Sequence, residues 1–151
     1  MKNCIKFTLF LLFFNLSAQD SEKAAVQKTI ETFFEGFHQQ DTTLIKRMVT
    51  KDIIMQRITI DSLENASVRN QDFHEFLKAI VSIPKTTQFQ EIIKSYSIQI
   101  DGPMANVWTP YEFNRNGKFS HCGVNSFQLF KENRDCKIIY IIDTGRTNRC
   151  K

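Results

Sequence analysis

The chain has 151 residues, with 20 lysines and arginines against 16 aspartates and glutamates, which gives a formal net charge of +4. This balance, without any run of basic residues, excludes the strongly basic surface of a nucleic-acid-binding protein. Beyond the first nineteen residues about 130 remain, a length that fits one domain around one hydrophobic core, so residues 20–151 are predicted to form a single domain.

Residues 1–19 are predicted to be a signal peptide. Two lysines precede the apolar run Phe7–Phe14, and small residues follow before Gln19, as a signal peptidase requires. The run is too short to cross a bilayer comfortably, because a membrane-spanning helix takes about 20 apolar residues. The alternative is an anchor that the mature protein keeps. We expect cleavage near Gln19 or Asp20, export to the bacterial periplasm or the medium, and no membrane contact afterwards.

Two amphipathic helices are predicted at the start of the mature chain. Asp20 or Ser21 can cap the first helix, because a short polar side chain accepts hydrogen bonds from the free amides of the first turn. Asp41 caps a second, shorter helix, and the two make a helical hairpin. The apolar residues of the first helix recur at helical spacing and form one wide stripe: Val26, Ile30, Phe33, Phe34 and Phe37.

A strand, a loop and a third helix are predicted next. Ile53–Asp61 is rich in β-branched residues, which favour a strand, whereas Ser62–Arg69 is polar and predicts a loop. Asn70 is the predicted cap of the third helix, and Pro84 ends it, because proline cannot donate a helical hydrogen bond. The apolar face of this helix carries Phe73, Phe76, Leu77, Ile80 and Val81.

Four strands complete the prediction. Asn116 and Gly117 form the strongest hairpin signal in the chain, a type I′ turn. Asp101, Gly102 and Pro103 make the turn before it, and another turn is expected at Asn133 and Arg134. The predicted strands are Phe89–Ile100, Met104–Asn114, Lys118–Phe130 and Lys137–Thr144.

The order of elements predicts an α+β fold. Long antiparallel strands that follow covering helices give a curved sheet wrapped against three N-terminal helices. Such a sheet forms a cone with an apolar interior, and the open end of the cone is a natural place for a ligand pocket.

This order resembles the nuclear transport factor 2-like superfamily, which includes SnoaL-like polyketide cyclases, ketosteroid isomerases and limonene epoxide hydrolases. The resemblance covers nearly all of residues 20–151. The last third, W-x-P-Y-E-F…G-K-x-S-H-C-G-x-N-x-F…K-I…I-I-D-T-x-R over Trp108–Arg146, is more narrowly similar to small exported bacterial proteins labelled as nuclear transport factor 2 family or lumazine-binding. The resemblance implies a cone-shaped, cystatin-like fold that is often dimeric, with a pocket between sheet and helices, and it implies no single activity. Cys136 stands where the group leads us to expect a tryptophan.

The hairpin turns predict which residues face one another across the sheet. If Asn116 and Gly117 are the two turn residues, then Glu112 faces His121, and the next turn places His121 beside Arg146. One face of the sheet would then carry Trp108, Glu112, His121, Asn125, Phe127, Tyr140, Ile142 and Arg146.

Three residues of this face could do chemistry. His121 could transfer a proton, because its unperturbed pKa of about 6.5 lies near neutral pH. Glu112 could orient the imidazole, and Arg146 could hold an anionic group with two hydrogen bonds. The alternative is a cross-strand cluster of these three side chains that only satisfies itself.

Tyr111 and Asp143 remain candidates on the opposite face. A single β-bulge would move part of one face to the other, and Pro110 is a plausible place for one. The candidate ligand-binding residues are Trp108, Tyr111, Asn125, Phe127, Tyr140, Asp143 and Arg146, beside the candidate catalytic pair of His121 and Glu112.

The spacing of the cysteines and histidines in the sequence predicts no metal or cofactor site. Removal of residues 1–19 leaves Cys122, Cys136 and Cys150, an odd number that leaves at least one thiol unpaired. Either all three are partly buried thiols, or Cys122 and Cys150 form a disulfide after export. His38 and His74 lack ligand spacing, so we predict no metal and no cofactor.

Three functions fit these residues. The first is an exported protein that binds a small, partly aromatic molecule in the cone. The second is an acid–base enzyme of the isomerase, cyclase or hydrolase kind that uses His121 and a carboxylate. The third is a dimeric interaction module, and a homodimer is expected from the resemblance in every case.

Overall fold

The computed structural model describes the backbone of residues 3–61, 63–133, 135–148 and 150, and it describes side chains from residue 20 onward within these ranges. Arg134 of the predicted last turn and the first two residues of the predicted signal peptide lie outside the described residues. The helices are α1 (Asn3–Gln39), α2 (Thr42–Met48) and α3 (Phe73–Ser82). The strands are β1 (Val49–Ile60), β2 (Ala66–Gln71), β3 (Phe89–Ile93), β4 (Ser97–Asp101), β5 (Met104–Arg115), β6 (Lys118–Glu132) and β7 (Asp135–Arg146).

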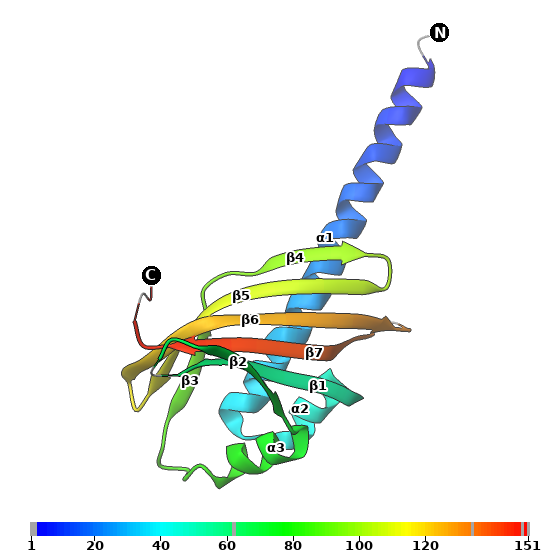
Figure 1. The fold of residues 1–151 in the computed structure, drawn as a ribbon. Helices are drawn as coiled ribbons and strands as arrows, with labels where there is room; N and C mark the ends of the chain where they lie inside the picture. The colour runs from blue at the N-terminus through cyan, green and yellow to red at the C-terminus, as the bar shows by residue number, and fades with distance from the viewer. Residues whose placement is uncertain (1–2, 62, 134, 149, 151) are drawn as a thin grey trace.

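The predicted α+β fold is confirmed. The seven strands form one curved sheet in the order β2-β1-β7-β6-β5-β3, with β4 also paired to β5. Figure 1 shows α1 passing behind this sheet, with α2 and α3 gathered at one end of it. The last strands are antiparallel as predicted, but β1 runs parallel to β7, so the sheet is mixed.

The helices bury the predicted apolar stripe. Ile30 is fully buried, and Val26, Phe33 and Phe34 are nearly so. Helix α1 is continuous from Asn3 to Gln39 in this chain, whereas the start predicted at Asp20 or Ser21 applies to the mature chain after cleavage. Among the described residues, no helix has both the length and the hydropathy needed to span a membrane. Cleavage at the predicted site stays a prediction.

Of the predicted caps of α2 and α3, the first is confirmed and the second is wrong. The carboxylate of Asp41 accepts hydrogen bonds from the amides of Thr43 and Leu44 at 2.9 Å, so the predicted cap of α2 is confirmed. The cap of α3 is Asp72 and not Asn70, because Asn70 still belongs to β2.

Two segments of the sheet differ from the prediction, because hydrogen bonding between backbones determines them and the spacing of apolar residues does not. All of β2 is exposed and lacks the alternating burial of a half-buried strand. The loop predicted over Ser62–Arg69 is right at residues 63–65 and wrong at Ala66–Arg69, which belong to β2. The predicted strand Phe89–Ile100 is two strands, β3 and β4. Both pair with β5, and the break between them begins at Lys94, whose amide donates to the carbonyl of Pro110 at 2.8 Å.

Two β-bulges decide which side chains face the helices. The predicted turn is confirmed, since Asn116 and Gly117 both have positive φ values of 52° and 72°. The pairing of β5 with β6 then slips by one residue at Ser120, and the pairing of β6 with β7 slips at Ile139. No slip occurs at Pro110, where a bulge was expected. Each slip reverses which neighbours share a face.

Gly123 is required by the close packing of three strands, which gives a prediction. A Cβ at this position would overlap the carbonyl oxygen of Thr144 and would lie 2.8 Å from the Tyr111 ring. Gly123→Ala should therefore lower the free energy of unfolding by about 1–3 kcal/mol through overpacking, measured by urea denaturation. Ser97→Ala on exposed β4 is the control, and a Gly123→Ala protein as stable as that control would contradict the packing.

Candidate functional site

The candidate site is a pocket of about 230 Å³ between the helices and the concave face of the sheet. Seven aromatic rings line it: Phe33, Phe34 and Phe37 of α1, Phe76 of α3, Tyr111 and Phe113 of β5, and Phe127 of β6. Polar groups converge on one side of the same pocket: Gln56, Arg57, Gln71, Glu91, His121, Asn125 and Asp143. Apolar walls with a few convergent polar groups are the usual composition of a small-molecule site.

A row of paired residues supplies part of the polar side. Thr109, Asn125, Asp143 and Arg57 are successive Cα partners across β5, β6, β7 and β1. Thr109 and Asn125 are buried, whereas the Arg57 side chain is 44 % exposed. The row therefore runs from the buried centre of the sheet to the mouth of the pocket.

Glu91 is the carboxyl at the inner end of the pocket. Asn125 donates its side-chain amide to Glu91 Oε1 at 2.6 Å. The pKa of Glu91 is raised to about 7, mainly by burial and also by the charge of Asp143, while the Asn125 hydrogen bond and the charge of Arg57 act in the opposite direction. Glu91 Oε2 has no hydrogen bond to a described residue. Since no fully buried side-chain oxygen of the described residues lacks a partner, this atom opens into the pocket.

His38 fixes the backbone that carries Glu91. The amide of Glu91 donates to His38 Nε2 at 2.9 Å, which ties β3 to the end of α1. An acceptor nitrogen must be unprotonated, and burial lowers the pKa of His38, in agreement with this hydrogen bond. His38 was given no role from the sequence, and here it positions the carboxyl.

Asp143 is the second carboxyl of the pocket, and it has a cationic neighbour. Its Oδ2 lies 3.4 Å from Arg57 Nη2. Burial raises the pKa of Asp143, while the charge of Arg57 acts in the opposite direction. The two carboxyls thus differ in environment, because Glu91 has an amide partner where Asp143 has a guanidinium.

Tyr111 and His121 form an aromatic wall beside these carboxyls. The Tyr111 hydroxyl donates to the Thr144 carbonyl at 2.8 Å, and burial raises the pKa of this phenol, so it serves as a fixed wall. The His121 ring stacks on Phe113 with centroids 4.9 Å apart and meets Tyr111 edge-on at 5.8 Å. Burial, and then the charge of Arg57, lower the pKa of His121.

The structure brings together some of the predicted site residues and not others. His121, Asn125, Phe127, Tyr111 and Asp143 all line the pocket. The bulge at residue 120 pairs His121 with Phe113, and the bulge at residue 139 pairs Asn125 with Asp143. The slips thus move Tyr111 and Asp143 to the face that carries His121.

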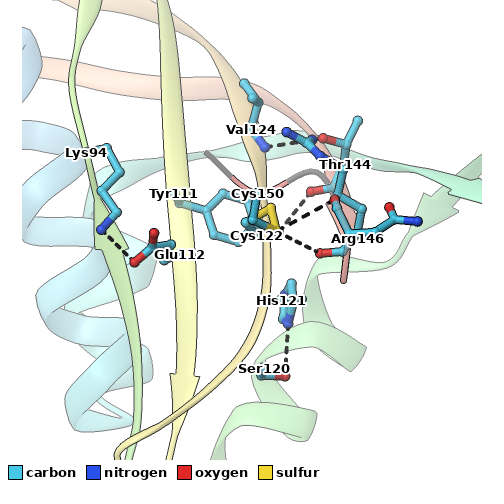
Figure 2. The surroundings of a disulfide bond; sticks show 11 residues. Lys94, Tyr111, Glu112, Ser120, His121, Cys122, Val124, Thr144, Arg146 and Cys150 are labelled. Atoms are coloured by element: carbon cyan, nitrogen blue, oxygen red, sulfur yellow. Dashed lines mark hydrogen bonds and ion pairs between the residues drawn. A yellow bond between two sulfur atoms is a disulfide. The ribbon is translucent and has the colours of Figure 1, made fainter.

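The other four predicted residues do not line this pocket. Trp108 is 52 % exposed, and its partner is Ser126. Glu112 faces Cys122 and forms an ion pair with Lys94 at 2.6 Å, so the predicted contact with His121 is wrong. Figure 2 shows Glu112 turned towards Lys94 and His121 lying near Ser120.

Arg146 and Tyr140 also belong to other surroundings. Arg146 is the partner of Cys122, so the predicted pairing of Arg146 with His121 is wrong as well. The Tyr140 hydroxyl donates to Gln56 Oε1. All of these errors have one cause, because each slip by one residue exchanges the two faces of a strand.

Glu91 and Arg57 were missed, although the sequence carries a signal for both. Glu91 stands between Phe89 and Ile93 at two-residue spacing, and Arg57 follows Met55 in the same way. A charged residue on the apolar parity of a strand points into the core, where it is costly unless it serves a purpose.

Cys122 and Cys150 form the disulfide that was one of the two alternatives for the thiols, with Cα atoms 5.8 Å apart. Cys136 is free and partly buried. Figure 2 shows the bridge joining the C-terminal segment to β6, next to His121 in the sequence. Within the described residues, no group of three or more histidines, cysteines or acids is placed to hold a metal ion.

A second recess of similar size lacks such polar groups. It measures about 220 Å³ and lies beside the middle of α1, at Ser21–Val26, against β4, β5 and β6. Its wall is mainly apolar, and the Glu22–Lys131 ion pair at 2.9 Å stands among its charged residues. We therefore place the candidate site in the pocket that holds Glu91.

Comparison with known proteins finds structures with a similar fold, but no relative that is similar in sequence. No protein-family model and no curated protein matches the chain. Among solved structures, a nuclear transport factor 2-like protein of unknown function from Shewanella baltica has a TM-score of 0.61 at 14 % identity, over 85 % of this chain and 96 % of that one.

Two further structures carry an assignment. A protein of the nuclear transport factor 2-like family from Streptomyces avermitilis, provisionally assigned as a dehydratase, has a TM-score of 0.65 at 13 % identity, over 85 % of this chain and 98 % of that one. The β subunit of a provisionally assigned aromatic-ring-hydroxylating dioxygenase from Novosphingobium aromaticivorans has a TM-score of 0.68 at 12 % identity, over 87 % and 94 %. The chain thus has the nuclear transport factor 2-like fold, as its sequence pattern suggested.

Proposed function

We propose that this chain, which has the nuclear transport factor 2-like fold, binds a small and partly aromatic molecule in the pocket that holds Glu91. The observation that carries the proposal is the lining of seven aromatic rings around two carboxyls, one of which has an oxygen open to the pocket. Flat rings offer large contact areas to an aromatic ligand. A donor group on that ligand would complete the hydrogen bonding of Glu91.

The volume of the pocket limits the size of the ligand. Drug-sized ligands occupy pockets of about 300–1,000 Å³, and benzene fits a cavity of about 150 Å³. A pocket of about 230 Å³ lies between these values, so it suits a molecule of one or two rings. A larger molecule such as a steroid would have to extend through the mouth.

A thermal-shift screen of residues 20–151 tests the proposal. Compounds with one or two rings should stabilise the protein, by roughly 2.7 kcal/mol at a concentration about 100 times the dissociation constant. Steroids should give smaller shifts. A panel of one-ring and two-ring aromatic compounds that leaves the melting temperature unchanged would contradict the proposal.

Acid–base catalysis in the same pocket is a second candidate function. The specific observation is the difference between the two carboxyls, because groups with separated pKa values can act as proton donor and acceptor. Glu91 has a pKa of about 7, so both of its protonation states are populated at neutral pH. In this proposal Glu91 replaces Glu112, which lies on the other face, while His121 keeps a place in the wall. The dehydratase assignment of one structural neighbour is in keeping with this kind of chemistry.

Export and a homodimer stay predictions. The outer face of the sheet exposes Trp108 and Ile54 by more than half, which is the kind of surface a second copy could cover. A dimer would leave the pocket accessible, because the pocket lies on the concave face.

A further inference from the structure

The mouth of the pocket is cationic, and this feature narrows the class of ligand further. Arg57 and His121 line both the aromatic pocket and an open recess of about 280 Å³ beside it. The two spaces therefore meet at these residues. None of the described residues that line the recess is acidic, and two of them are arginines, Arg57 and Arg146.

Arg57 has hydrogen-bonding capacity to spare. Within the described part of the chain, its guanidinium contacts one acid, Asp143, at 3.4 Å and donates no hydrogen bond. A guanidinium has five N–H donors in a planar fork that matches a carboxylate. Its side chain is 44 % exposed, so the remaining donors face the mouth and are accessible to a ligand.

A second arginine adds to the positive charge beside Arg57. Arg69 of β2 is the direct Cα partner of Arg57 across the sheet edge, and its side chain is exposed. Opposed side chains on one sheet face lie about 5 Å apart, and like charges there repel. Asp143 is the one acid that forms an ion pair with either arginine among the described residues. A bound anion would relieve the repulsion that remains.

Gly145 lets the Arg57 guanidinium lie close to the backbone of β7. A Cβ at Gly145 would overlap Arg57 Nη2, so the guanidinium lies directly on the glycine backbone. The ring of His121 lies 3.5 Å from the same point. The guanidinium thus lies against β7 at the place where the two spaces meet.

We propose that the ligand is a small aromatic carboxylic acid, whose ring lies in the pocket and whose carboxylate is held by Arg57 at the mouth. This inference rests on the proposed binding function and adds the chemical class of the ligand. Glu91 adds little negative charge below pH 7, because its carboxyl then keeps its proton. Asp143 forms an ion pair with Arg57 at 3.4 Å, and the guanidinium has further N–H donors for the ligand carboxylate.

Isothermal titration calorimetry at pH 6 with 1-naphthoate and its neutral amide tests the inference on residues 20–151. The wild-type protein should bind 1-naphthoate at least about tenfold more tightly than 1-naphthamide, as expected for charge-assisted hydrogen bonds. Arg57→Gln should abolish this preference and leave the affinity for 1-naphthamide within about threefold.

Two further variants distinguish the position of the Arg57 guanidinium from the overall charge of the protein. Gly145→Ala keeps the charge of Arg57 and displaces the guanidinium, so it should also weaken 1-naphthoate selectively. Lys28→Gln, at an exposed position of α1, removes one positive charge elsewhere and should change the affinity for neither probe. Equal wild-type affinities for the two probes, or a preference that survives in Arg57→Gln, would overturn the inference while the binding function stands. If neither probe binds, the inference fails, and the thermal-shift panel decides separately whether the binding function stands.

Discussion

Glu91→Gln should stabilise the protein by roughly 3 kcal/mol at pH 8 and have almost no effect at pH 4.5. The folded-state pKa of Glu91 is about 7 against 4.5 for an ordinary glutamate, so the folded state binds this proton more tightly than the unfolded state. Stability that is fully present below pH 4.5 is therefore lost as the pH rises to about 7. Glutamine is neutral at every pH, and its carbonyl oxygen can still accept from Asn125. Urea denaturation from pH 4.5 to 8 measures the effect.

The matched control is Glu132→Gln, which replaces an exposed glutamate at the end of β6. This change should leave the pH dependence of wild type intact. If Glu91→Gln and Glu132→Gln show the same pH dependence, Glu91 does not carry a raised pKa, and the acid–base candidate loses its support. In the acid–base reading, Glu91→Gln also abolishes any turnover found, while ligand binding persists.

Loss of the Cys122–Cys150 disulfide should destabilise the protein by about 3.5 kcal/mol, the value that the chain-entropy model gives for a closed loop of this length. The bridge closes a loop with a sequence separation of 28 residues and attaches the C-terminal segment to β6. Its removal enlarges the set of conformations of the unfolded chain and frees the end of β7. The measurement is the denaturation midpoint of Cys150→Ser against wild type, each with and without a reductant.

Cys136→Ser is the control for this experiment, because Cys136 is the free cysteine of the described residues. It should keep the sensitivity of wild type to the reductant, whereas Cys150→Ser should be insensitive. A wild-type protein whose stability does not change on reduction would show that the bridge contributes nothing.

The fold could be predicted because its determinants are local. The apolar stripe around Ile30, the cap at Asp41 and the turn at Asn116 and Gly117 each use residues close together in the sequence. Strand β2 escaped prediction because it is held by backbone pairing with β1, and its exposed side chains carry no periodic signal.

The site could be predicted only in part, because it depends on registers across several strands. Counting from the turn gives the correct partner for Asn114, but the single extra residue at Ser120 shifts every later pair. Nothing in the residue types marks that position as a bulge. His121 was therefore placed in the right region with the wrong neighbour, Glu112. Glu91 arrives from β3, which was predicted only as part of a longer strand.

The same register explains why the polar side of the pocket is built as it is. The slip at Ile139 pairs Asn125 with Asp143, and Asp143 in turn pairs with Arg57 across the parallel β7–β1 contact. One amide thus connects two carboxyls, since Asn125 also donates to Glu91. The bulges bring these groups together, in line with the frequent presence of bulges beside functional sites.

The most direct test of the central claim is the dissociation constant of the best aromatic compound from the screen, measured for two variants. Ile141→Phe adds volume to a residue that lines the pocket, and Trp108→Ala removes the largest exposed side chain of the outer face. A ligand in the pocket predicts that Ile141→Phe weakens binding at least about tenfold and that Trp108→Ala leaves it unchanged. Full affinity in Ile141→Phe, or a loss confined to Trp108→Ala, would contradict the account.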